Sequence, residues 1–268
     1  MLRKITIGQY YSIESFIHKL DPRVKLFATL MYVISLFVVN NWAGYLLGAL
    51  ALAVYIRASK VPLSFIMRGL KPIIFLLCFS VLFNLFLTDG GKVLISFWII
   101  KITTEGVKSA FFMGIRLIML IIGSSIMTYT TTPNQLTDAM EKSLGFLNKV
   151  KVPVHELAMM MSIALRFIPI LVEETDKIMK AQLARGANFE EGNLIQRAKA
   201  MVPILVPLFI SAFRRATDLA LAMEARCYHG GDGRTKMKPL KYKRCDYMMY
   251  AAFAIYFASM LGSRFLPL

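Results

Sequence analysis

Acidic residues are scarce in this sequence. Its 268 residues include 16 Asp plus Glu against 32 Lys plus Arg, which gives a formal net charge of +16. Such an excess indicates nucleic acid, an anionic membrane surface or an acidic protein as a partner. Hydrophobic residues make up 57% of the chain, too many for a water-soluble globule. We therefore expect the lipid bilayer, and no nucleic acid, to surround much of the chain.

Cysteine and histidine are also rare, with three of each. The cysteines are Cys78, Cys227 and Cys245. Their number and spacing indicate neither a disulfide framework nor a zinc site. His155 lacks the second histidine of a zinc-protease helix, because Met159 stands at that place. Residues 90–92 and 230–235 do not match a phosphate-binding P-loop. We expect no metal, no bound cofactor and no catalytic residue in this chain.

Long apolar segments are what the chain does contain. Five of them run over residues 24–39, 42–56, 73–87, 107–128 and 247–265. At 1.5 Å per residue the first two each cover roughly 24 Å, close to a hydrocarbon core of roughly 30 Å once flanking residues are added. Residues 93–102 are apolar but too short to cross as a helix. The sequence predicts an all-α integral membrane protein with about five transmembrane helices.

Lysine and arginine near the ends of these segments predict their orientation, because basic residues are retained in the cytoplasm. Five lie before or at the start of the first segment, at Arg3, Lys4, Lys19, Arg23 and Lys25. Four more lie between the second and third, at Arg57, Lys60, Arg68 and Lys71. The opposite side has only Lys92, Lys101 and Arg264. We expect a cytoplasmic N-terminus and an outside C-terminus.

Residues 129–246 separate the fourth and fifth segments and therefore fall on the cytoplasmic side or at its membrane boundary. Two helical patterns dominate, over 154–183 with a kink at Pro169 and over 193–225. Within the second, residues 200–213 have Ser211 as their one polar side chain. This run is about 21 Å of helix, too short to cross and too apolar for water. We expect it to lie along the membrane or under the spans.

The two long patterns end alike. The first ends with Ala184, Arg185 and Gly186. The second ends with Ala225, Arg226 and Cys227. An Asp lies nine residues before Arg185 and eight before Arg226. Alanine lets another backbone approach, and a guanidinium at a helix end presents a fork of donors to carboxylates or carbonyls. The alternative is that each arginine only complements its helix dipole.

Further short motifs occur in a fixed order with these ends. The first is Gly8-Gln9-Tyr10 with Ser15, His18, Leu20, Asp21, Pro22, Arg23 and Lys25. The next are Leu165-Arg166-Phe167-Ile168-Pro169 and Ala181-Gln182 before Ala184. The last is Ala222-Met223-Glu224-Ala225-Arg226 with Tyr228. On these residues, nearly the whole chain resembles the transmembrane T component of energy-coupling factor transporters, an uptake class related to ABC transporters.

The resemblance implies that the two Ala-Arg-Gly motifs end cytoplasmic coupling helices, each docking in a groove of one of two ABC ATPase subunits. It assigns ATPase binding to Ala184, Arg185, Gly186, Ala225, Arg226 and Cys227. Cys227 departs from the family pattern, which usually has glycine there. The geometry of the second cap is therefore in question, because positive φ is disfavoured for residues other than glycine.

The resemblance further implies a membrane-embedded S component that captures a vitamin or similar micronutrient. ATP and Mg²⁺ are then expected on the partner ATPases and not on this chain. The expected location is the cell membrane. The expected organisation is a cytoplasmic segment and four spans in 1–128, a coupling-helix region in 129–246, and a last span in 247–268.

Two alternatives remain from the residues. An autonomous secondary transporter usually has carboxylates or histidines inside its spans, whereas Arg116 is the one clear charge buried in a span of this sequence. Bonding between helices, or extension of the side chain toward the membrane surface, is the favoured use of that arginine. A membrane scaffold would differ from the coupling model in having no ATPase partners.

Overall fold

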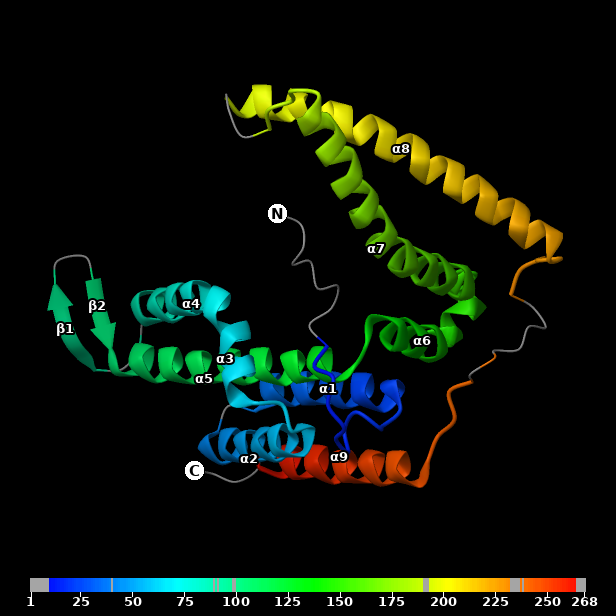
Figure 1. Ribbon diagram of the computed structural model, residues 1–268. Helices are drawn as coiled ribbons and strands as arrows, with labels where there is room; N and C mark the ends of the chain where they lie inside the picture. The colour runs from blue at the N-terminus through cyan, green and yellow to red at the C-terminus, as the bar shows by residue number, and fades with distance from the viewer. Residues whose placement is uncertain are drawn as a thin grey trace. The chain divides into compact units, whose positions relative to one another are not determined.

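The computed structural model describes residues 10–39, 41–88, 90, 92–97, 100–189, 193–231, 237 and 239–263. These residues form two compact units. The first, here the bundle unit, lies within Gly8–Ala139 and Leu240–Leu268. The second, here the α7/α8 unit, lies within Met140–Pro239. Figure 1 shows the helices of both.

Helices α1, α2, α5 and α9 pack against one another in the bundle unit, and α4 packs along α5 (Figure 1). Their bounds are α1 Pro22–Val38, α2 Trp42–Ser59, α4 Ile74–Leu87, α5 Thr104–Thr130 and α9 Arg244–Ser263. Each coincides closely with one of the five apolar segments of the sequence. A short helix α3, Leu63–Leu70, and a 3₁₀ turn η1, Lys71–Ile73, connect α2 to α4.

An antiparallel hairpin joins α4 to α5 (Figure 1). It consists of β1, Val93–Phe97, and β2, Ile100–Thr103, with an irregularity between Val93 and Ile95. The sequence analysis excluded a crossing helix here, and the structure pairs the segment with itself. The fold is otherwise all-α in the part of the chain that the structure describes.

The α7/α8 unit is built mainly of two long helices. Its elements are the end of α6 (Pro133–Ser143), the 3₁₀ helix η2 (Gly145–Val150), α7 (Val154–Ala184) and α8 (Leu194–Ala225). The two long helices agree with the predicted patterns 154–183 and 193–225. Pro169 lies inside α7, whose axis bends part-way along in Figure 1. Pro203 and Pro207 lie inside α8.

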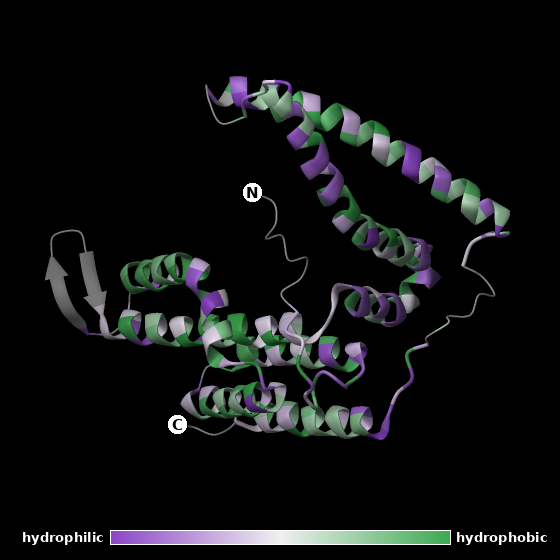
Figure 2. Ribbon diagram, viewed as in Figure 1, coloured by the Kyte–Doolittle hydropathy of each residue, from purple (hydrophilic) through white to green (hydrophobic). Residues whose placement is uncertain are grey.

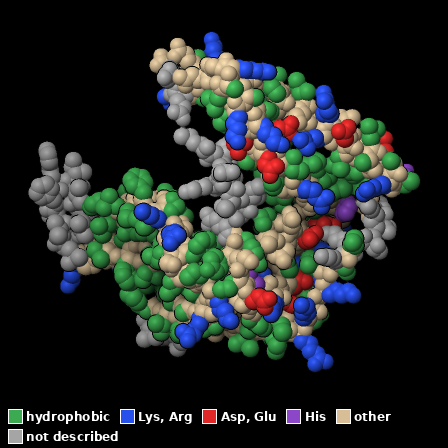
Figure 3. Space-filling model, viewed as in Figure 1, with side chains coloured by type: hydrophobic (Ala, Val, Ile, Leu, Met, Phe, Trp, Pro, Cys, Tyr) green, Lys and Arg blue, Asp and Glu red, His purple; other side chains and the backbone are tan. Residues whose placement is uncertain are grey.

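Hydropathy differs between the helices. Figure 2 shows α4 almost wholly hydrophobic, whereas α8 alternates between hydrophobic and hydrophilic residues. Figure 3 likewise shows basic and acidic side chains interspersed over the α7/α8 unit. Alternation of this kind is typical of a helix that touches an apolar environment on one face and a polar one on another.

Five described helical stretches are long and apolar enough to cross a membrane, by length and composition alone. They are Trp42–Ser59, Leu63–Leu87, Thr104–Thr130, Val154–Ala184 and Ile195–Ala225. The number agrees with the prediction, but the set contains α7 and α8 in place of α1 and α9. Helix α1 has 17 residues, and α9 begins with Arg244 and Asp246. The cytoplasmic placement of 129–246 stays a prediction.

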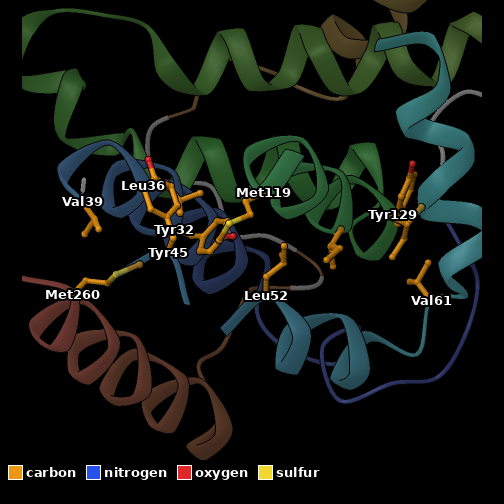
Figure 4. Close-up of a cluster of buried hydrophobic side chains, with 11 residues drawn as sticks. Tyr32, Leu36, Val39, Tyr45, Leu52, Val61, Met119, Tyr129 and Met260 are labelled. Carbon is orange, nitrogen blue, oxygen red and sulfur yellow. The ribbon is translucent and has the colours of Figure 1, made fainter. Parts of the chain in front are cut away.

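The core of the bundle unit lies where α1, α2, α5 and α9 meet. Figure 4 shows its side chains, with Tyr32 and Leu36 from α1, Leu52 from α2, Met119 from α5 and Met260 from α9. All five are at most 7% exposed. Burial of one such side chain stabilises a fold in water by about 1.5–3 kcal/mol, but within a bilayer close packing contributes instead.

The chain before α1 attaches to the end of α5. The backbone N–H of Tyr11 donates to the carbonyl of Tyr129 at 2.9 Å. The buried ammonium of Lys25 donates to the carbonyl of Thr130 at 2.9 Å and to that of His18 at 3.3 Å. Thr130 is the last residue of α5, so Lys25 supplies a donor and a positive charge at a helix C-terminus, where both are favourable.

His18 holds this segment in a turn. Its Nε2 donates to the carbonyl of Tyr11 at 3.0 Å, and its Nδ1 accepts from the Ser15 hydroxyl at 2.7 Å. Burial, assisted by the nearby charge of Lys25, lowers the pKa of His18 and so favours the neutral ring that these two bonds require. Ser15, His18 and Lys25 belong to the opening motif of the sequence, and the structure gives them a role in holding the bundle together.

Asp21 and Asp246 connect the starts of α1 and α9. The carboxylate of Asp21 caps α1 by accepting from the N–H of Arg23 at 2.9 Å. The Arg23 guanidinium returns two bonds to Asp21 and lies 3.9 Å from the ring centre of Tyr242. The N–H of Asp21 donates to the buried carboxylate of Asp246 at 2.9 Å. Hydrogen bonds of Asp21, Arg23 and Asp246 thereby join the starts of the two helices.

Candidate functional site

The candidate site is the pair of helix ends predicted from the sequence. In α7, the last helical residue is Ala184, Arg185 follows as the C-cap, and Gly186 has φ +87°. The N–H of Gly186 donates to the carbonyl of Leu183 at 3.0 Å, and that of Ala187 to Gln182 at 3.0 Å. These two bonds make a Schellman cap, in which the left-handed residue reverses the chain.

The end of α8 has the same cap. Ala225 is the last helical residue, Arg226 is the C-cap, and Cys227 has φ +56°. The N–H of Cys227 donates to the carbonyl of Glu224 at 2.8 Å, and that of Tyr228 to Met223 at 3.0 Å. The question that Cys227 raised is thereby answered, because this cysteine adopts the left-handed conformation that glycine adopts in the first copy.

All six predicted site residues are exposed. They are Ala184, Arg185, Gly186, Ala225, Arg226 and Cys227. Within the described part of the chain, neither arginine side chain makes a hydrogen bond or an ion pair. Each guanidinium therefore keeps its full set of donors for another molecule. An arginine that served its own helix alone would instead be expected to bond the last carbonyls.

A polar brace holds α7 and α8 together. The carboxylate of Glu174 accepts from the Ser211 hydroxyl at 2.5 Å and from the Arg215 guanidinium at 2.6 Å. Further along, the Gln182 amide donates to the carbonyl of Pro203 at 3.5 Å. Ser211 is the polar residue that interrupts the apolar run 200–213. The sequence made this residue conspicuous but did not indicate that Glu174 is its partner.

The brace also fixes where the two arginines lie. The contacts of Glu174 with Ser211 and of Gln182 with Pro203 run antiparallel. Arg185 therefore lies beside the first third of α8, whereas Arg226 follows the last residue of α8. The 23 residues from Pro203 to Arg226 amount to about 35 Å of helix. The site is thus two similar projections at opposite ends of one braced helix pair.

Charged residues elsewhere on α7 and α8 contribute less to this brace. Among the described residues, the ion pair between Glu174 and Arg215 is the one that links α7 to α8. The structure shows no ion pair between Arg214 and Asp218, although they lie four residues apart in α8 and are both described. Both face solvent, where such pairs contribute little.

We expect a substitution at Cys227 to act through the cap. Valine is expected to fray the last turn of α8, because a β-branched residue is poorly tolerated at positive φ. The amides of residues 224–228 should then exchange with deuterium roughly 5 to 30 times faster, the equivalent of about 1–2 kcal/mol. Glycine at the same position should leave exchange unchanged or slow it. Equal exchange in the valine variant and the native protein would contradict this account.

Comparison with known proteins identifies the chain. The family CbiQ, described as "Cobalt transport protein", matches residues 14–237. The "Energy-coupling factor transporter transmembrane protein EcfT" of Clostridium kluyveri is 55% identical over 249 residues, 92% of each chain. The protein of the same name from Ruminiclostridium cellulolyticum is 53% identical over 249 residues, 93% of each chain. The one from Lactococcus lactis subsp. cremoris is 46% identical over 254 residues, 95% of this chain and 96% of the relative. The chain therefore belongs to the family of transmembrane T components of energy-coupling factor transporters.

Proposed function

We propose that this chain is the coupling subunit of an ATP-driven uptake transporter for a vitamin or similar micronutrient. In this proposal Arg185 and Arg226 each dock in a groove of one ABC ATPase subunit, with Ala184, Gly186, Ala225 and Cys227 allowing close approach. The observation that carries it is the pair of matching caps, each presenting an exposed arginine without a partner among the described residues. Two similar ends suit two similar partners.

The brace between α7 and α8 supports transmission of movement. ATP binding and hydrolysis on the partner subunits would change the separation of the two docking grooves. Because Glu174, Ser211 and Arg215 fasten the helices to each other, displacement at one arginine moves the pair rather than one helix end alone. A lever of this kind needs two arrangements whose balance the ATPases shift.

The apolar surface of α8 supports a membrane-embedded partner. Seven large apolar side chains of this helix are 49–65% exposed: Met201, Val202, Leu205, Val206, Phe209, Ile210 and Phe213. A continuous apolar face of this length is unfavourable in water and marks a surface for protein or lipid. We assign it to the S component, which the coupling helices would reorient so that solute is released inside.

The remaining parts of the proposal rest on the family and on the distribution of basic residues in the sequence. The chain itself is non-catalytic and binds no cofactor, whereas ATP and Mg²⁺ belong to the ATPase subunits. It lies in the cell membrane with its N-terminus and α7/α8 unit cytoplasmic and its C-terminus outside. Arg116 is not taken as a transport residue, because its guanidinium donates to the carbonyl of Val39 at 3.2 Å and lies 5.7 Å from the ring centre of Tyr45.

Purification of the tagged chain from its native membrane in mild detergent tests this function. We expect two ABC ATPases and a small apolar membrane protein to copurify, and mass spectrometry of the latter to reveal the solute class. Membranes that carry the tag on an unrelated spanning protein provide the control. Recovery of the chain without any ATPase would favour the scaffold or autonomous-transporter alternatives.

A further inference from the structure

An apolar cavity lies inside the bundle unit between α1, α2 and α9. Its volume is about 390 Å³, within the range of roughly 300–1,000 Å³ typical of ligand sites. Small residues leave the space: Ala28 on α1, Ala51 and Ala58 on α2, and Ala252 on α9. The cavity thus results from several small side chains on three neighbouring helices rather than from one packing defect.

The chemistry of the walls selects a hydrocarbon occupant. Aromatic rings line the cavity, among them those of Phe16, Tyr55 and Phe253, and its surface is almost entirely apolar. Water is disfavoured in such a space, because it requires several polar partners. Phe16 and Val54 also line it and are 48% and 66% exposed, so the cavity opens onto the surface of the bundle. In a bilayer, that surface faces acyl chains.

The cavity lies in one half of the bundle. Its lining comes from the segment before α1, the middle turns of α1 and α9, and the last turns of α2. It therefore extends from the middle of the bundle toward the end where α2 gives way to α3. Arg57 and Lys60 lie at the same end of α2, and both are exposed. Arg57 lies one helical turn after the exposed lining residue Val54, and Lys60 caps the same helix end. An anionic group at the mouth of the cavity would therefore lie at the basic end of α2.

We infer that the cavity binds one acyl chain of an anionic phospholipid, whose phosphate lies near Arg57 and Lys60. The acyl chain matches the apolar walls, and a lipid headgroup at the membrane surface matches the basic residues at the end of α2. This inference depends on the bundle spanning a membrane and not on the proposed coupling of ATPases. It gives a bound lipid a defined place among the helices that form the core.

A photoreactive phospholipid tests the inference. The full-length chain is placed in nanodiscs with phosphatidylglycerol that carries a diazirine midway along one acyl chain, and labelled residues are mapped by mass spectrometry. We expect labelling to concentrate on residues 16–32, 51–58 and 249–256. Uniform labelling over the whole lipid-facing surface, including Phe75 and Leu82 of α4, would overturn the proposal. Labelling of a copurified protein in place of the cavity residues would overturn it as well.

Two pairs of variants sharpen the test. Ala51→Phe fills the cavity, whereas Ala53→Phe adds the same ring to the exposed face of the same helix. We expect cavity labelling to fall roughly tenfold in Ala51→Phe, which corresponds to the loss of burial of about two methylene groups of the acyl chain. Labelling should persist in Ala53→Phe. If Ala51→Phe does not fold, Ala252→Phe with its control Ala254→Phe serves on α9. Equal labelling in a folded filling variant and its control would refute the site.

A third comparison concerns the headgroup. Phosphatidylcholine with the same photoreactive chain should label the cavity roughly 25 times less than phosphatidylglycerol, since each of the two basic residues contributes about a fivefold preference. Replacement of Arg57 and Lys60 by Gln should remove this difference. If the two lipids label the native protein equally, the proposed contact with an anionic headgroup is wrong.

Discussion

Replacing both Arg185 and Arg226 by alanine is expected to abolish recovery of the ATPase subunits with this chain. Each guanidinium is exposed and has no partner in the described part of the chain, so its loss leaves the fold of α7 and α8 unaltered. In a docked complex, however, each would be desolvated and paired. Removal of one member of such a pair weakens binding by roughly 30-fold or more, and two sites multiply the effect.

The single variants and a matched control complete this experiment. Arg185→Ala and Arg226→Ala should each weaken recovery, because the two caps have the same geometry. Replacement of Arg214 by alanine removes an exposed arginine of α8 that lies away from both caps. That variant should copurify the ATPases as the native chain does. Full assembly and normal transport by the double variant at 185 and 226 would end the assignment of these residues.

The five helices of the bundle were predictable from the sequence because their cause is local. A run of apolar side chains as long as the hydrocarbon core satisfies its backbone only as a helix, whatever its neighbours are. The predicted segments 42–56 and 107–128 therefore lie within α2, Trp42–Ser59, and α5, Thr104–Thr130. Which of these helices touch was not predictable, since it depends on side chains far apart in sequence, such as Leu36 and Met260.

Short elements were less predictable. The basic residues Arg68 and Lys71 indicated a polar connection after α2. The structure instead forms α3 there and buries Ile66 and Leu70. The length of residues 93–102 excluded a crossing helix. It did not predict a strand, because a strand forms only with a partner. The turn between β1 and β2 lies outside the described residues. For α3 the deciding contacts come from α5, a distant part of the chain, whereas for the hairpin they come from the facing strand.

At the candidate site the sequence indicated the residues but not their geometry. The repeated Ala-Arg ends were visible as a pattern, whereas the left-handed backbone at Cys227 was not, because cysteine has no preference for it. The two hydrogen bonds of the Schellman cap determine that conformation. Similarly, the sequence did not indicate what Glu174 contacts, and only the packing of α7 on α8 selects Ser211 and Arg215.

Replacing Asp246 by alanine is expected to cause the largest loss of stability in the bundle. Its carboxylate is 1% exposed and accepts two backbone hydrogen bonds, from Asp21 at 2.9 Å and from Lys243 at 2.7 Å. Alanine would leave the buried N–H of Asp21 and the partly buried N–H of Lys243 without an acceptor, at about 1–3 kcal/mol each. We expect the free energy of unfolding to fall by about 2–5 kcal/mol, measured by titration with sodium dodecyl sulfate and circular dichroism.

Asp246→Asn separates the loss of hydrogen bonds from the loss of side-chain volume. An amide has one oxygen, so it keeps one of the two bonds and turns an NH₂ group toward the other donor. Its destabilisation should therefore lie below that of alanine but remain measurable. Asp218→Ala, on the exposed face of α8, should leave the unfolding transition within about 0.5 kcal/mol of the native protein. If Asp246→Ala had the same free energy of unfolding as Asp218→Ala, the carboxylate would not be what joins α9 to the start of α1. The aromatic and apolar contacts between these helices would then hold them together.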